Sequence, residues 1–239
     1  MVVAAAREIR DREIVFVGMR LPLLGFGLAK ATHAPHAIGL FENGVIRDRP
    51  AESFIYTMGD PPNIAGAVAC LGLIDVMSLL QQGRVDVGFL GGAEIDPEGN
   101  LNTTRTYPDG RLVRLPGSGG AGDIASLAHR TVLIMEHEAR RFREHVAYIT
   151  SPGHYPGRRR GGPATLITTL GVFDLAGGRF RVKTLHPGVP VDTLRLATGF
   201  ALELTAEVPT TLPPSPAELA YIRQADPQGF WTGDTRKAG

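Results

Sequence analysis

The stretch GLFENGVIRD, residues 39–48, places Glu42 between an apolar run and an Asn-Gly turn signal. A lone glutamate at the end of a strand is usually a solvated turn residue. It is also ionised at neutral pH, so a glutamate held at a ligand-binding edge is a candidate for chemistry. The elements around Glu42 must decide between these two interpretations.

A second stretch, GSGGAG at residues 117–122, formally matches the G-x-G-x-x-G pattern of dinucleotide-binding turns, and Glu136 follows near the spacing of a ribose-binding acid. That pattern requires a buried strand directly before it. The preceding RLVRLP instead carries Arg111 and Arg114 and ends in Pro116. We therefore expect a glycine turn that runs into a helix and offers backbone N–H groups to a phosphate or an oxyanion, or a turn selected only for packing.

Strands alternate with helices along the first two thirds of the chain. Short apolar runs predict buried strands at 13–18, 36–44, 85–92 and 131–136. Helices are expected at 21–34 and 120–130. Another, a long amphipathic helix ended by Gly83, is expected within 61–85 and includes Val68, Leu71, Asp75, Leu79 and Gln82. This alternation favours a largely parallel sheet covered on both faces.

The C-terminal third has a different pattern of apolar and polar residues. Residues 164–185 alternate apolar and polar side chains around Gly177-Gly178, which predicts antiparallel strands with a hairpin. Residues 191–200 and 216–224 are expected to form short helices. The predicted fold class is α/β, with a mainly parallel sheet flanked by helices, antiparallel strands in the C-terminal third, and a single domain over 1–239.

Ligands of open parallel sheets bind beyond the carboxyl ends of the strands. Glu42 and the pair Gly91-Gly92 follow predicted strands, and the turn at 117–122 precedes a predicted helix. Three loops are thus expected to converge on one edge of the sheet, which favours a functional Glu42.

Composition excludes several classes of protein. Lys and Arg total 25 against 24 Asp and Glu, so there is no electrostatic footprint for nucleic acid or an anionic membrane. The single cysteine excludes an intrachain disulfide and a multi-thiolate metal site. The chain has no long apolar run, and its charged N-terminus lacks a signal-peptide pattern, so we expect a soluble, cytoplasmic protein that contacts no membrane.

Other motifs fall short of a site. MEHEARRF approaches H-E-x-x-H, but Arg141 stands four positions after His137, so we expect no metal and a charge-paired helical surface. No G-x-S-x-G elbow is present, which leaves a serine hydrolase unsupported. Residues 158–160 are three arginines that form a solvated loop or contact a phosphate-bearing ligand.

Read together, these pieces resemble the B (β) subunit of glutaconate CoA-transferase, within the class I CoA-transferases. The resemblance follows nearly the whole chain in order, with ENG at 42–44 followed by GSGGA at 117–121 as its most specific pairing. Further matching pieces are VFVGMRLPLLGFGLAKATHAP, FLGGAEIDPEGNLNTT, IMEHEARRFREHVAYITSPG, TGF and DPQG.

The resemblance implies a mechanism and a set of site residues. Glu42 corresponds to the glutamate that attacks the acyl-CoA thioester and carries CoA as a glutamyl thioester. The Gly119-Gly120 backbone, with Gly117, corresponds to the part that contacts the reacting thioester. Further parts of the cleft are Asn43, Gly91, Gly92, Asn100 and Asn102. Coenzyme A is then a substrate, no cofactor or metal is bound, and a separate α subunit completes an α2β2 enzyme.

Two departures leave the acid substrate open. Glutaconate transferases read close to VESG where this chain reads FENG, and residues 105–116 differ from their counterpart in length and content. A neighbouring branch hydrolyses carbon–carbon bonds of cyclic acyl-CoA intermediates and shares phrases like GVFDL at 171–175 and LHPGV at 185–189. That branch lacks the turn glutamate, so Glu42 favours transfer. A non-catalytic sugar-phosphate sensor is the third interpretation.

Overall fold

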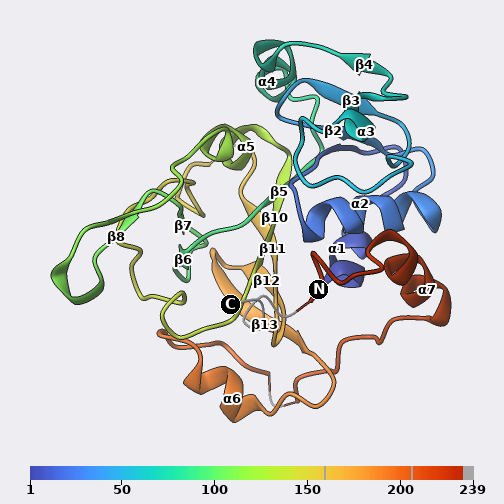
Figure 1. The fold of residues 1–239 in the computed structure, drawn as a ribbon. Coiled ribbons are helices and arrows are strands. Elements are labelled where there is room, and N and C mark those ends of the chain that lie inside the picture. The colour runs from blue at the N-terminus through green and yellow to red at the C-terminus, as the bar shows by residue number, and fades with distance from the viewer. Residues whose placement is uncertain (159, 206, 234–239) are drawn as a thin grey trace. The chain divides into compact units, whose positions relative to one another are not determined.

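The computed structural model describes residues 1–158, 160–205 and 207–233, which form two compact units. The terminal unit comprises Met1–Val76 and the chain from Pro213, drawn in blue, cyan and red in Figure 1. The central unit comprises Met77–Leu212, drawn in green to orange. The expectation of a single domain over 1–239 stays a prediction.

The terminal unit contains four strands in the order β1-β2-β3-β4. β1 pairs with β2 in parallel, whereas β2–β3 and β3–β4 are antiparallel. The strands are β1 (Ile14–Phe16), β2 (Ile38–Leu40), β3 (Val45–Arg47) and β4 (Ala69–Cys70). The helices are α1 (Val2–Arg7), α2 (Leu21–Ala31), α3 (Pro61–Ile64) and α7 (Pro216–Ala225), and α4 (Leu73–Gln81) begins here.

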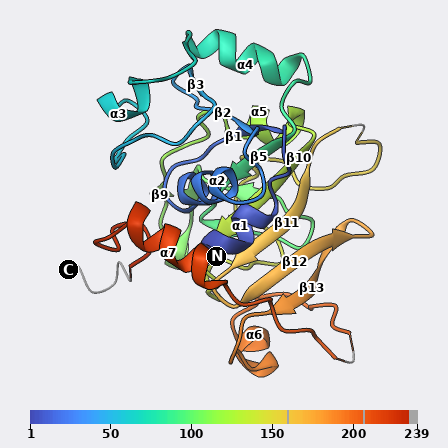
Figure 2. The ribbon, with the colours of Figure 1, turned by 90° about the vertical axis from the view of Figure 1, so that its right-hand side faces the viewer.

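Helix α2 packs against both α1 and α7 in this unit (Figure 2). A Cβ on Gly25 would lie 3.1 Å from the Ala5 Cβ, and one on Gly27 would overlap the Tyr221 hydroxyl. Glycine disfavours a helix by about 1 kcal/mol relative to alanine. Here the two glycines let the neighbouring helices approach closely, which explains why the predicted helix forms in spite of them.

The central unit is built on five strands in the order β13-β12-β11-β10-β5. β5–β10 and β10–β11 are parallel, and β11–β12 and β12–β13 are antiparallel. The strands are β5 (Val87–Leu90), β10 (Arg130–Met135), β11 (Pro163–Thr168), β12 (Gly171–Ala176) and β13 (Arg179–Leu185). Helix α5 (Ala121–Leu127) packs on β5, where Gly88 makes room for Ile124. The remaining elements are hairpins β6 (Glu94–Ile95) with β7 (Leu101–Asn102) and β8 (Arg105–Thr106) with β9 (Val113–Arg114), the 3₁₀ turn η1 (Pro108–Gly110), and α6 (Val191–Leu196).

The predicted fold class is confirmed. Parallel strands carry flanking helices, and residues 163–185 form antiparallel strands whose last hairpin turns at Gly177-Gly178, as the alternation indicated. A second antiparallel set, β2-β3-β4, was not anticipated. No helix in the described parts of the chain combines the length and apolarity that crossing a bilayer requires.

The long helix predicted within 61–85 is wrong. The segment forms α3, then β4, then α4, which ends before Gly83 as expected. Gly66 adopts a left-handed φ of 70°, and the Val68 and Leu71 N–H groups donate to the carbonyl oxygens of Ile46 and Gly44. Pairing with β3 therefore outweighs the helical period of the side chains.

The N-terminal cap of α7 gives a stability prediction. The Ser215 hydroxyl accepts from the Glu218 N–H at 3.2 Å, while the Glu218 carboxylate accepts from the Ser215 N–H at 2.7 Å and from Arg7. Ser215→Ala should lower the free energy of unfolding by about 1 kcal/mol, because it removes a helix cap. Urea titration measures this. Ser215→Thr is the matched control and should stay close to wild type; equal losses for both would contradict the capping role.

Candidate active site

Glu42 is the second residue of the tight four-residue loop, 41–44, that joins β2 to β3. The Gly44 N–H donates to the Phe41 carbonyl at 2.9 Å, and the Phe41 N–H donates to the Val45 carbonyl at 2.9 Å. Phe41, which begins the loop, and Val45, which follows it, are 1% and 3% exposed, whereas Glu42 is half-buried. The Glu42 carboxylate thus belongs to a tight turn that has an apolar base.

Gly44 has no substitute in this turn. Its φ is +100°, and a Cβ added there would lie 1.9 Å from the carbonyl oxygen of Leu71, the residue that follows β4. Glu42 and Asn43 are absent from the residues with positive φ, so the loop is a turn followed by a left-handed glycine rather than the two-residue Asn-Gly turn. This arrangement makes Glu42, and not Asn43, the residue that opens the turn.

Asn43 braces the same turn. Its side-chain Nδ2 donates to the Met58 carbonyl at 2.7 Å, and its Oδ1 accepts weakly from the Val45 N–H at 3.4 Å. The side chain expected in the cleft is therefore tied to the segment that follows β3.

The glycine turn lies in the central unit, at the start of α5. Gly117 has a φ of +100°, donates its N–H to the Thr103 carbonyl at 2.8 Å and accepts from the Thr103 hydroxyl at 2.8 Å. Gly119 is exposed and left-handed, and Gly120 is buried at the N-terminal cap of α5. β9, the strand before the turn, is exposed at both residues, unlike the buried strand of a dinucleotide fingerprint.

The other predicted residues of this unit lie around the β6–β7 hairpin. Gly91 and Gly92 directly follow β5, as expected. Asn102 is fully buried, and its amide bonds the Glu94 carboxylate at 2.7 Å and the Arg105 carbonyl at 2.6 Å. The Asn100 Nδ2 donates to the Asp96 carboxylate, and the Asn100 Oδ1 accepts from the Gly153 N–H. Both asparagines thus hold the hairpin together with their side chains.

The structure places the predicted residues in two groups. Glu42 and Asn43 belong to the terminal unit, and the predicted glycines and Asn100 and Asn102 belong to the central unit. Thr103, next to Asn102, joins the hairpin to the glycine turn through its two bonds to Gly117. Nothing in the sequence singles out Thr103, because a threonine after a strand carries no recognisable signal.

Arg158 is a structural residue. Its guanidinium donates to the carbonyl oxygens of Pro152, Gly153 and Ala125, and burial lowers its pKa. These bonds tie the Arg158 guanidinium to its own loop and to the Ala125 carbonyl of α5. Arg159 lies outside the described residues.

The segment around His137 is not a helix. Residues 136–142 are irregular, so the expected helical surface is wrong, although Arg140 and Arg141 do pair with Glu138. His137 stacks on Phe142 with ring centroids 3.7 Å apart and contacts the hydroxyls of Thr168 and Thr198. Among the described residues, no cluster of three metal-binding side chains occurs.

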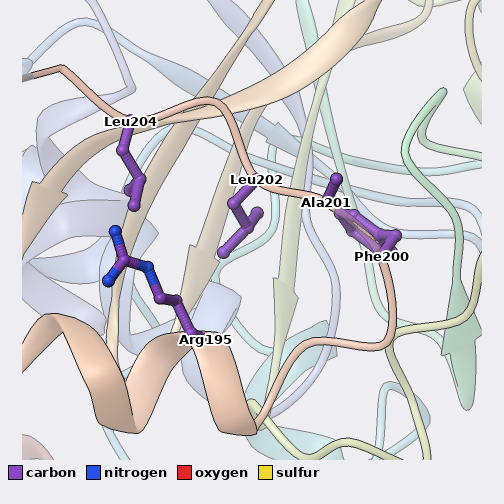
Figure 3. Close-up of a pocket in the computed structure, with 5 residues that line it drawn as sticks. All are labelled: Arg195, Phe200, Ala201, Leu202 and Leu204. Carbon is purple, nitrogen blue, oxygen red and sulfur yellow. The ribbon is translucent and has the colours of Figure 1, made fainter.

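A groove of about 290 Å³ lies beside α6 in the central unit (Figure 3). Arg195 extends from the helix along the chain that follows Phe200, and the lining residues are Arg195, Phe200, Ala201, Leu202 and Leu204. The groove contains no carboxylate and none of the predicted site residues, so it is not the candidate active site.

Known proteins identify the family. The coenzyme A transferase family matches residues 1–197, and the chain belongs to that family. It is 36% identical over 238 residues to the B chain of 3-oxoadipate CoA-transferase from Pseudomonas knackmussii, covering 93% of this chain and 90% of the relative. The resemblance read from the sequence is therefore confirmed: this is a CoA-transferase chain of the B (β) type.

Two solved structures share the fold over almost the whole chain. Glutaconate coenzyme A-transferase from Acidaminococcus fermentans superposes with a TM-score of 0.88 at 28% identity, covering 98% of this chain and 95% of its own. The decarboxylase AibA/AibB superposes with a TM-score of 0.85 at 31% identity, covering 96% and 94%. The same fold thus supports transfer and decarboxylation, and the site residues must distinguish these reactions.

His137 gives a pH prediction. Burial lowers its pKa to about 4, from an ordinary value of 6.5, so between these pH values the unfolded chain binds a proton that the folded chain does not. This contribution to the free energy of unfolding is complete above pH 6.5 and is lost as the pH falls towards 4. By pH 5 the loss is about 2 kcal/mol. His137→Phe should reduce the decline in unfolding free energy between pH 7 and pH 5 by that amount.

Urea titrations at both pH values measure this decline. His145→Gln, at an exposed histidine of the same unit, is the control and should decline like wild type. If His137→Phe declines as steeply as wild type, the titration of His137 does not control acid stability.

Proposed function

We propose that this chain is the catalytic B (β) chain of a class I CoA-transferase and that Glu42 carries CoA as a glutamyl thioester. The observation that carries the proposal is the placement of Glu42 on a tight turn above buried Phe41 and Val45, with Gly44 required by the Leu71 carbonyl. This turn presents a carboxylate on a firm support, and a carboxylate can act as a nucleophile without a general base.

The proposed reaction has two matched halves. The Glu42 carboxylate attacks the acyl-CoA carbonyl, forming an acyl-glutamyl anhydride and releasing CoA thiolate. The thiolate then attacks the glutamyl carbonyl, which forms the glutamyl-CoA thioester and releases the first acid as its carboxylate. A second carboxylate reverses these steps and leaves as its CoA ester. The activated acyl bond is kept throughout, so no nucleotide hydrolysis is needed.

The glycine turn is proposed to stabilise the charged intermediates. Backbone N–H groups at Gly119 and Gly120 are assigned to the oxyanion of the thioester carbonyl, and donors of this kind lower a barrier by about 3 kcal/mol. Gly117, whose N–H is bonded to Thr103, is assigned to holding the shape of this turn. Gly91, Gly92, Asn100 and Asn102 are assigned to supporting the cleft.

Substrates and partner follow from the relatives. The names of two of them contain the dicarboxylic acids 3-oxoadipate and glutaconate, so we propose short dicarboxylic acids as the acyl group and the acceptor. The 3-oxoadipate relative is named as one chain of a multi-subunit enzyme, and the decarboxylase pairs two chains. We propose an α subunit as partner, in an α2β2 enzyme that acts in the cytoplasm.

Covalent labelling tests the role of Glu42. The complex is incubated with succinyl-CoA or glutaryl-CoA, treated with borohydride to reduce a glutamyl thioester, and mapped by peptide mass. The label should fall on Glu42, and Glu42→Ala should lose CoA transfer by at least about 10³-fold, since no other group replaces the nucleophile. Glu42→Asp keeps a carboxylate on a shorter side chain, so it tests whether the carboxylate must reach the acyl-CoA carbonyl from the glutamate position.

The acceptor dependence of the reaction separates transfer from related chemistries. A transferase consumes acyl-CoA only when a carboxylic acid acceptor is present and forms the acceptor's CoA ester. Steady release of free CoA without acceptor would indicate a hydrolase, and release of CO₂ a decarboxylase. Either result with an unlabelled Glu42 would overturn the proposal.

The partner proposal predicts that the isolated chain is inactive. CoA transfer should appear only after the α subunit is added, because the resemblance assigns much of the acid pocket to that chain. Sedimentation and assay of the chain with and without the α subunit from the same genome test this. Full activity from the chain alone would contradict the two-subunit proposal.

A further inference from the structure

Arg47 is a buried arginine at the end of β3, the strand that leaves the Glu42 turn. It is 1% exposed, and burial lowers its pKa. Its guanidinium donates to five main-chain carbonyl oxygens, those of Arg49, Pro50, Pro62, Asn63 and Ala65. These oxygens lie at the two ends of the segment 49–65, so a single side chain gathers both ends.

The interior of this segment is fixed by Asn63 and Asp60. Asn63 is fully buried, and its Nδ2 donates to the Met58 carbonyl at 2.8 Å. The Asp60 carboxylate accepts from the N–H groups of Tyr56 and Thr57 and from the Thr57 hydroxyl. The Met58 carbonyl oxygen is therefore held at a defined point.

The same Met58 oxygen receives the Asn43 amide at 2.7 Å. Two asparagines, one in the Glu42 turn and one in the buried loop, thus converge on one acceptor. Arg47 holds the Asn63 carbonyl at 2.6 Å, which completes a chain of contacts from Arg47 through Asn63 and Met58 to Asn43. Asn43 is adjacent to Glu42 in the turn.

We infer that Arg47 and Asn63 are positioning residues for Glu42, acting through the Met58 carbonyl and Asn43. This inference rests on the proposed function. An attacking carboxylate must be held within about 0.5 Å of its productive position, and a displacement of 1 Å can cost about 100-fold in rate. The turn is short and half-exposed, so the loop beside it supplies the restraint that β2 and β3 alone do not.

Single-turnover labelling of the complex tests this inference. The rate of glutamyl-thioester formation with glutaryl-CoA is followed by mass spectrometry for wild type, Asn43→Ala, Asn63→Leu and the double variant. Each single variant should react about 10- to 100-fold more slowly, reach the same final labelling of Glu42 and keep the KM for glutaryl-CoA. The double variant should be no slower than the slower single variant, because both act through one oxygen.

Controls separate positioning from loss of fold. Ser215→Ala weakens the same unit at the N-terminal cap of α7, makes none of the contacts of the Arg47–Asn63–Met58–Asn43 chain, and should label at the wild-type rate. Asn43→Ala alters an exposed side chain, so it tests the inference even if Asn63→Leu does not fold. A wild-type labelling rate in Asn43→Ala would overturn the inference, and so would rate losses that multiply in the double variant. In both cases the proposed function still stands if wild type carries the label on Glu42. Absence of the label from wild type would instead overturn the proposed function.

Discussion

The close approach of Leu71, directly after β4, to the turn after β2 is the constraint on which the candidate site depends. The Leu71 carbonyl oxygen occupies the space that any side chain at position 44 would need, and the Leu71 N–H bonds the Gly44 carbonyl. A glycine in the left-handed region is therefore required. This fixes the turn at residues 41–44, in which Glu42 directly follows the buried Phe41.

Polar side chains in both units serve mainly to hold backbone. Arg47 binds main-chain oxygens with a buried guanidinium and Arg158 with a partly buried one, and Asn100 and Asn102 use their amides to close a hairpin. Burying a charge is costly unless its hydrogen bonds are satisfied, and carbonyl oxygens satisfy them here. Such bonds stabilise irregular loops, which is where this fold carries its candidate chemistry.

His137 shows how one buried group links packing to acid stability. It stacks on Phe142 and Phe173 within the core of the central unit, where the neutral ring packs well and the charged ring does not. The local pattern MEHEARRF suggested a charged surface, but the histidine turns inward while the adjacent glutamate and arginines pair outside.

The sequence by itself determined the fold class, most strands and helices, and the family, because buried strands and glycine turns leave local patterns that tertiary contacts seldom override. Only the tertiary structure decided the secondary structure of residues 61–85, where pairing with β3 gives α3, β4 and α4 in place of one long helix. It also revealed the roles of Arg47, Asn63 and Thr103. Their partners are main-chain atoms brought close by folding, and main-chain atoms leave no mark in the pattern of side chains.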